Sequence, residues 1–168
     1  MSEPKTLQEA ITYFSNPDNC LGYLVARRWP KGVICPTCGS EKVSFNATRC
    51  IWQCGSHHAK RQFSVKVGTI FEDSPISLDK WLTAAWMIAN CKNGVSSYEV
   101  ARAIGVTQKS AWFVMHRIRL AMQDNRGSKE NRINDGERFD YVMSHVLGKR
   151  LTWDNLTGKT SESTKRQN

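Results

Sequence analysis

Cysteine and histidine side chains gather in one part of the sequence at a spacing suited to a metal ion. Cys35 and Cys38 form a Cys-x-x-Cys pair followed by glycine, and such a pair on a tight turn directs two thiolates at one tetrahedral ion. Cys54 can supply the third ligand, and either His57 or His58 the fourth, because the imidazole is long. We therefore predict one structural Zn²⁺ ion with no coordination position left for catalytic water.

The other three cysteines are expected to be structural. Cys50 pairs poorly with this set, because joining it to Cys54 leaves two histidines without a role, and it is expected to be a strand residue. Cys20 and Cys91 lie on apolar helix faces and are predicted to be buried. In a reducing compartment, metal binding and packing explain six cysteines better than disulfides do.

A second constellation follows the cysteines in the chain. Ser96 and Glu99 form a capping box, Gly105 ends that short helix, and Thr107 can cap a longer helix that runs to residue 123. A short helix, a tight turn and a longer helix are typical of the helix-turn-helix motif, whose second helix enters the major groove of DNA.

The predicted DNA contacts fall into two groups. The residues at the start of the second helix are nearest base edges, and they are Gln108, Lys109 and Ser110. Three arginines are better placed for phosphates, and they are Arg102, Arg117 and Arg119. Such a hairpin can also be an ordinary helical pair with a solvated basic face.

The remaining residues of the longer helix are expected to pack. Its predicted inward seam consists of Ala111, Met115, Ile118 and Met122. Three further residues are interpreted as packing residues and are left outside the predicted site, namely Trp112, Phe113 and His116.

The charge of the chain agrees with a polyanionic partner. The 168 residues carry a net charge of +9 with a pI near 9.5. Residues 77–123 hold six Lys and Arg against two Asp and Glu, a net of +4, so the helical middle is the most one-sided part. Neither a membrane span nor a signal peptide is recognisable, and we expect an intracellular, cytoplasmic protein.

Hydrophobic periodicity and turn residues predict an α+β fold that is mostly α. The predicted order is an N-terminal helical segment (1–32), a zinc ribbon of short antiparallel strands (33–73), a three-helix unit with the helix-turn-helix (74–123), a linker (124–137) and a flexible C-terminal tail with one short helix (138–168).

Several long motifs resemble the zinc-ribbon insertion-sequence transposases that carry a DDE catalytic domain. These motifs are RWPKGVICPTCGS, WQCGSHHAKRQFSVKVGTIFEDS, LDKWL and GVTQKSAWFVMHRIRLAM, and they occur in the family's order over residues 6–123. The resemblance implies zinc at Cys35, Cys38 and Cys54, places His58 at the fourth ligand position, and implies that the helix-turn-helix binds the terminal inverted repeats of the element.

The C-terminal segment RFDYVMSHVLGKRLTWDNLTGK also resembles the end of such transposases, but the catalytic domain expected before it is missing. That domain needs well over about a hundred residues to hold three carboxylates and two metal ions. Here a polar linker stands in its place. The acidic residues in it and just after it are interpreted as solvated charges, and they are Asp124, Glu130, Asp135, Glu137 and Asp140. We therefore expect no catalytic residues and no enzyme activity.

The sequence thus predicts a zinc-dependent protein that binds duplex DNA, is associated with the bacterial nucleoid, and recognises transposon ends without catalysing transposition. It would associate with itself or with intact transposase. Two alternatives stay open: a DNA-targeting subunit of a separately encoded catalytic transposase, and a zinc-ribbon module for protein interaction.

Overall fold

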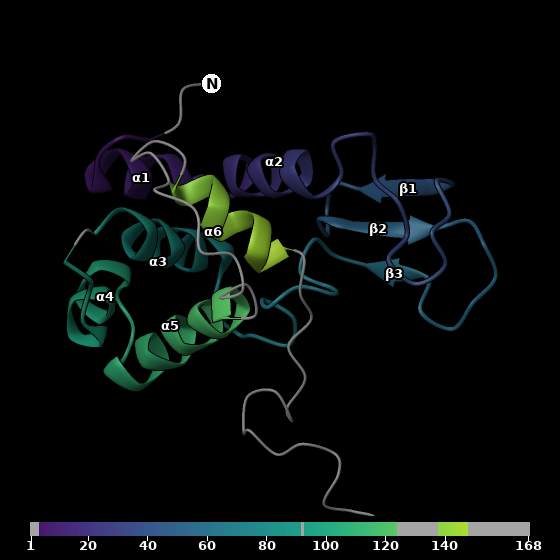
Figure 1. Ribbon diagram of the computed structural model, residues 1–168. Helices are drawn as coiled ribbons and strands as arrows, with labels where there is room; N and C mark the ends of the chain where they lie inside the picture. The colour runs from purple at the N-terminus through teal and green to yellow at the C-terminus, as the bar shows by residue number, and fades with distance from the viewer. Residues whose placement is uncertain (1–3, 92, 124–137, 148–168) are drawn as a thin grey trace, which may run out of the picture.

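A computed structural model describes residues 4–91, 93–123 and 138–147, in which six helices and a three-stranded sheet are formed (Figure 1). The predicted class, mostly α with a small antiparallel ribbon, is confirmed. The predicted linker at 124–137 and the chain after residue 147 lie outside the described residues. None of the helices described is long and apolar enough to cross a membrane.

The N-terminal helices begin where the sequence provides caps. α1 (Leu7–Phe14) starts after Thr6, whose hydroxyl accepts a hydrogen bond from the Glu9 amide. α2 (Pro17–Arg28) starts after Asn16, with its proline in the first turn. Both helices pack on α3 (Leu78–Asn90), whose buried face includes Trp81, Leu82 and Trp86.

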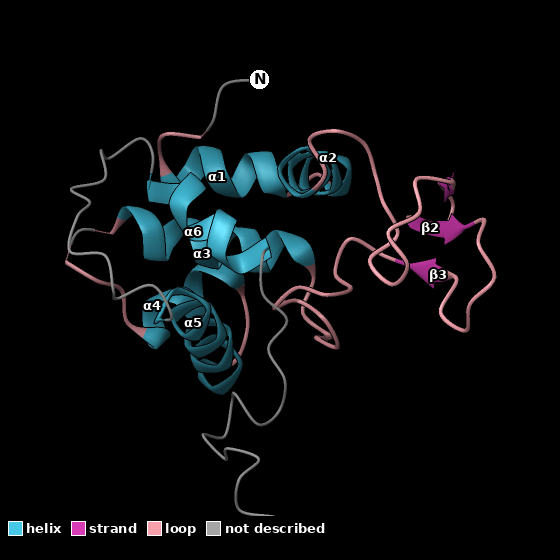
Figure 2. Ribbon diagram, turned by 45° about the vertical axis from the view of Figure 1, so that its right-hand side comes forward, coloured by secondary structure: helices cyan, strands magenta, loops and turns pink. Residues whose placement is uncertain are grey.

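The helix α3 is the centre of the helical body, because it contacts each of the other five described helices. It lies between α1 and α2 on one side and the α4–α5 hairpin on the other (Figures 1 and 2). The sheet lies to one side of these helices in both views. The core is therefore mainly helical, with the ribbon attached at its edge.

The α4–α5 hairpin has the predicted caps. α4 (Ser97–Ile104) begins with the complete Ser96–Glu99 capping box and ends at Gly105, which has a φ of 62° in the left-handed region. α5 (Gln108–Gln123) follows after a short turn, and the Thr107 hydroxyl accepts a hydrogen bond from the Ser110 amide. Glycine suits this turn because side chains disfavour a positive φ.

The C-terminal helix α6 (Arg138–Leu147) is part of the core, although the sequence led us to expect it in a flexible tail. Its buried residues contact α3 and α5, and they are Phe139, Val142, Met143 and Val146. The Phe139 ring stacks on Tyr23 with centroids 5.5 Å apart and lies 6.0 Å from Phe14. An ion pair between Arg27 and Asp140 also joins α2 to α6.

The ribbon is an antiparallel sheet of β1 (Val43–Asn46), β2 (Ile51–Cys54) and β3 (Gln62–Phe63), in the order β1-β2-β3. In this register Trp52 faces Phe45 on one side and Phe63 on the other. The ring centroids of Trp52 lie 4.9 Å and 6.0 Å from those of these two residues, and Trp29 approaches edge-on at 5.6 Å. Stacked aromatic rings thus form the small ribbon core.

Residues 64–77, here called the connecting loop, run from β3 to α3 and are held by buried or half-buried cations from several elements. Arg28 at the end of α2 donates hydrogen bonds to the carbonyl oxygens of Val65, at 2.6 Å, and Val67. Lys66 donates to the carbonyl oxygens of Ser74 and Ile76. Burial lowers the pKa of Arg28, and the nearby Glu72 carboxylate opposes this change. The Arg28 bonds fix the chain that leaves the ribbon to the end of α2, and the Lys66 bonds hold the connecting loop in its folded shape.

Candidate metal centre and nucleic-acid interface

Cys35, Cys38, Cys54 and His58 come together in the ribbon, with all four ligand atoms within 4.8 Å of one another. The Sγ atoms of Cys38 and Cys54 are 3.5 Å apart, and the Cys35 Sγ lies 3.5 Å from the His58 Nε2. Tetrahedral zinc with ordinary bond lengths requires about 3.8 Å between two sulfurs and about 3.6 Å between sulfur and nitrogen. The donor set and its spacing therefore fit one zinc ion.

The backbone around each pair explains how the ligands converge. Gly39, with a φ of 72°, closes the Cys-x-x-Cys turn by donating to the Cys35 carbonyl at 2.8 Å. At the end of β2, the Cys54 amide donates to the Arg61 carbonyl at 2.7 Å, so the loop carrying His58 returns beside the strand. The Ser56 amide donates a hydrogen bond to the Cys54 sulfur at 3.4 Å. Both turns thus hold their ligands from the backbone.

The chemistry of Cys54 favours metal binding. Burial raises the pKa of this thiol, but hydrogen bonds from His58, the Ser56 amide and the other two thiols lower it more, to about 6. The thiolate is the form that binds a metal ion. Since four protein ligands complete a tetrahedral shell, the site is suited to a structural ion.

The adjacent histidines have different positions. His58 is half-buried, and its Nε2 faces Cys35, whereas His57 is exposed and lies outside the ligand cluster. The Nδ1 atom of His58 is buried and has no hydrogen-bond partner among the described residues. Between the two candidates that the sequence left open, the structure supports His58.

The three remaining cysteines are outside the cluster. Cys20 is buried as predicted, and burial with a smaller contribution from Asp79 raises the pKa of its thiol to about 12. The predictions for the other two were wrong. Cys91 is exposed because α3 ends at Asn90, and Cys50 lies in the turn before β2 with a left-handed φ of 51°.

Most of the predicted DNA contacts lie on the surface of the α4–α5 hairpin. Arg102, Lys109 and Arg119 are exposed. Gln108 is half-buried and donates a hydrogen bond to the Ser97 hydroxyl at 2.9 Å, and Ser110 shares a hydrogen bond of the same length with Thr107. The two neutral residues predicted to read bases are thus already engaged within the hairpin.

Arg117 requires a correction. Its side chain is only 6% exposed, and it donates a hydrogen bond at 3.3 Å to the carbonyl oxygen of Glu72 in the connecting loop. Burial lowers the pKa of this guanidinium, and the nearby Asp73 and Glu72 oppose the change. Arg117 therefore braces the connecting loop against α5 and is not placed to contact a phosphate.

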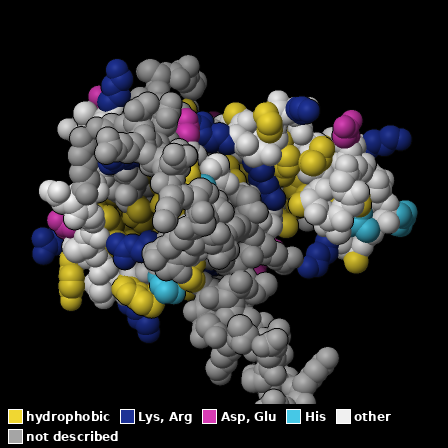
Figure 3. Space-filling view, viewed as in Figure 1, with side chains coloured by type: hydrophobic (Ala, Val, Ile, Leu, Met, Phe, Trp, Pro, Cys, Tyr) yellow, Lys and Arg dark blue, Asp and Glu magenta, His cyan; other side chains and the backbone are white. Residues whose placement is uncertain are grey.

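Trp112 was expected to pack but is 54% exposed. Its ring stacks on His116 one turn later, with centroids 4.9 Å apart and an angle of 6° between the planes. Figure 3 shows hydrophobic, histidine and basic side chains together over α5. The signal in the sequence was helical spacing, because Trp112 and His116 lie about 120° and about 160° around the helix from the buried Ile118.

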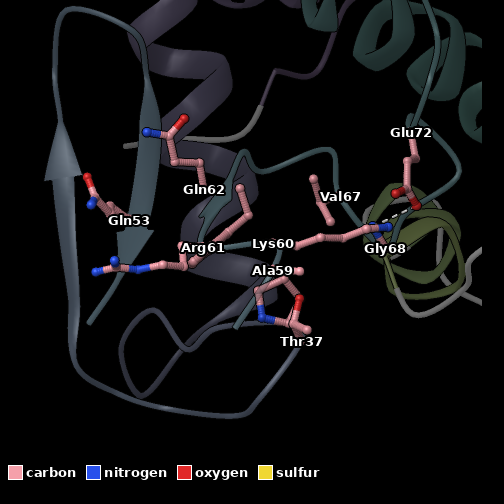
Figure 4. A pocket seen from close by; sticks show the side chains of 11 residues that line it. Thr37, Gln53, Ala59, Lys60, Arg61, Gln62, Val67, Gly68 and Glu72 are labelled. Atoms are coloured by element: carbon pink, nitrogen blue, oxygen red, sulfur yellow. Dashed lines mark hydrogen bonds between the residues drawn. The ribbon is translucent and has the colours of Figure 1, made fainter. Parts of the chain in front are cut away.

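A groove of about 790 Å³ lies between the ribbon and the connecting loop (Figure 4). Lys60 and Arg61 line it from the ribbon, while Gly68 and Glu72 line it from the connecting loop. The Glu72 carboxylate accepts a hydrogen bond from the Gly68 amide at 3.0 Å. Charges of both signs line the groove, so it has no evident preference for anions.

The ribbon matches a known class. Residues 15–58 match a family model described as the transposase zinc-ribbon domain, and this range contains all four ligands. The resemblance to zinc-ribbon transposases is thus confirmed for this part of the chain, which carries a transposase-type zinc ribbon.

The similarity extends beyond the ribbon in one relative. The chain is 25% identical over 140 residues to a Halobacterium salinarum protein described as an uncharacterized protein in transposable element ISH50. The similar stretch covers 83% of this chain and 46% of that protein, so the chain spans less than half the length of this relative. No solved structure gives a significant match.

Proposed function

We propose that the protein is a zinc-dependent duplex-DNA-binding protein that recognises the terminal inverted repeats of an insertion sequence without catalysing transposition. The observation that carries the proposal is the combination, in one chain, of a transposase-type zinc ribbon and a capped helical hairpin with exposed basic residues. Those residues are Arg102, Lys109 and Arg119.

The hairpin would act as a helix-turn-helix. Gly105 permits the tight reversal between α4 and α5, so that α5 can lie in the major groove while α4 crosses the backbone. Arg102 on α4 and Arg119 on α5 would contact phosphates, and the beginning of α5 would read base edges. Phosphate contacts supply most of the affinity, and base contacts supply the preference for a sequence.

The ribbon would position the hairpin instead of performing chemistry. Cys35, Cys38, Cys54 and His58 would hold the zinc ion, which would cross-link the ribbon. The hydrogen bond from Arg117 to the Glu72 carbonyl would then connect the loop behind the ribbon to α5. Asp140, which the sequence led us to interpret as a solvated charge, lies in α6 and forms an ion pair with Arg27 of α2. This pairing supports a structural role for that carboxylate.

A selection from a random duplex-DNA library tests the proposal, with zinc-loaded protein at two salt concentrations and a chelated sample beside it. We expect an enriched motif that depends on zinc and resembles the inverted repeats of an insertion sequence, with affinity falling as salt rises. Retention that does not change with salt would contradict DNA binding and favour a protein-interaction module.

A pair of variants locates the interface. Arg102→Ala removes an exposed charge from α4, and Arg49→Ala removes one from the turn between β1 and β2. We expect the first to weaken DNA binding and the second to change it little. Equal losses would mean that net charge, and not the hairpin, determines the affinity.

A further inference from the structure

The exposed surface of α5 carries aromatic side chains as well as basic ones. Lys109, Trp112, His116 and Arg119 are placed within an arc of about 80° around the helix, at about 100° per residue. The buried residues of the same helix, which include Ala111, Val114 and Ile118, occupy the opposite side. The surface therefore carries an aromatic pair with a cation before it and another after it.

The two rings of the aromatic pair are already stacked in the unbound chain. The Trp112 and His116 rings are parallel to within 6° and stacked at 4.9 Å, and a fixed side chain loses less conformational entropy on binding than a mobile one. At 54% exposure, Trp112 keeps much of its apolar surface in water. Unlike the singly exposed Tyr98, Trp112 is stacked on a second ring and lies between two cations, a combination that offers apolar and charged contacts together.

We propose that the Trp112–His116 pair reads bases in the major groove, with the indole packed on the C5-methyl group of a thymine. The inference rests on the DNA-binding function proposed above. Apolar contact with this methyl group distinguishes thymine from other bases in the major groove. Lys109, at the base-reading start of α5, and Arg119, as a phosphate contact, flank the pair.

Charge favours DNA over a protein partner for this surface. The helix α5 contains no aspartate or glutamate, and its two exposed cations, Lys109 and Arg119, lie on the same side as the aromatic pair. The side chains of Gln108 and Ser110 are less free to contact base edges, because they form hydrogen bonds with Ser97 and Thr107. Among the described residues, no such bond ties the aromatic pair to a neighbouring element, so the pair can supply the base contact instead.

The first test compares Trp112→Ala with Tyr98→Ala, which removes a 64% exposed aromatic side chain from α4. Affinity is measured for the selected site and for a scrambled duplex at one salt concentration, after circular dichroism has shown that both variants are folded. We expect Trp112→Ala to lose about tenfold or more on the selected site and little on the scrambled duplex. Tyr98 lies on the α4 surface that carries Arg102, so any change caused by Tyr98→Ala should be equal on the two duplexes.

The second test replaces each thymine of the selected site by uracil, which removes only the C5-methyl group. We expect one position at which this replacement weakens the parent protein and leaves Trp112→Ala unaffected, as a double-mutant cycle requires for two groups in contact.

Several outcomes overturn the inference while leaving the proposed function intact. These are an unchanged affinity of Trp112→Ala for the selected site, an equal loss on both duplexes, or a change in its self-association, which would assign the pair to a second copy of the chain. If the parent protein binds DNA without selecting a motif, base reading is excluded. If it does not bind DNA at all, the proposed function fails and the inference with it.

Discussion

His57 and His58 are adjacent in sequence, but only the second enters the ligand cluster. We expect His58→Ala to lose the zinc ion or to bind it at least tenfold more weakly, because the three remaining thiolates leave one of the four coordination positions without a protein ligand. His57→Ala is the matched control and should keep one zinc ion per chain. The zinc content of both variants is measured after dialysis against increasing concentrations of a chelator. A lower zinc content in His57→Ala than in His58→Ala would contradict the assignment.

Arg117 and Arg119 lie two positions apart on α5 with different burial, so their substitutions should separate folding from binding. Arg117→Ala should lower the free energy of unfolding by about 2 kcal/mol, because the Glu72 carbonyl loses its donor and packing is lost. Denaturant unfolding measures this change. Arg119→Ala should leave stability nearly unchanged.

For the proposed DNA binding, we expect Arg119→Ala to have the larger effect of the two substitutions. If Arg119 contacts a phosphate, Arg119→Ala should weaken binding to all duplexes alike and reduce the slope of log affinity against log salt by about one. An unchanged slope would exclude Arg119 as a phosphate contact.

At the scale of elements, the turn between α4 and α5 depends on one glycine. Gly105→Ala should cost about 1 kcal/mol of stability, because alanine is strained at a φ of 62° although the space for its methyl group is open. Gly22→Ala in the middle of α2 is the matched control, and it should stabilise the protein by about 0.5 to 1 kcal/mol. Thermal unfolding distinguishes them, and a Gly105→Ala variant as stable as the parent would contradict this account of the turn.

The local elements could be predicted because their signals are local. Thr6, Asn16 and the Ser96–Glu99 box mark helix starts, and the Cys-x-x-Cys turn needs only its own glycine. Each of these features is decided by residues a few positions apart.

The predictions that were wrong depend on contacts between distant parts of the chain. Arg117 is buried by a connecting loop whose Glu72 lies 45 positions earlier. Phe139 finds its place against Tyr23 and Phe14, so the helical spacing of α6 predicted the helix but not its partners. Trp112 is exposed because no element covers its side of α5 among the residues described.

At the scale of the whole molecule, the ribbon and the helices should differ in their need for zinc. The ribbon core consists of a few aromatic rings and the ligand cluster, whereas the helices share a larger buried core around α3. We expect chelation to unfold residues 33–63 and to leave the helices folded. Hydrogen exchange should therefore rise in the ribbon and remain slow in α3, and zinc addition should reverse the change. Equal loss of protection throughout would show that the two parts unfold together.

The bonds from Arg28 to the carbonyls of Val65 and Val67 bring together the two points at which the chain leaves and re-enters the helical body. Residues 29–64 thus form an inserted segment whose two ends lie close together in space. Segments of this kind can be exchanged without moving the part of the protein that carries them. Recombination could replace the ribbon by another of different length while α5 keeps its surface. A laboratory graft joined at Arg28 and Val65 would exchange the metal-binding ribbon and leave α5 in its present place.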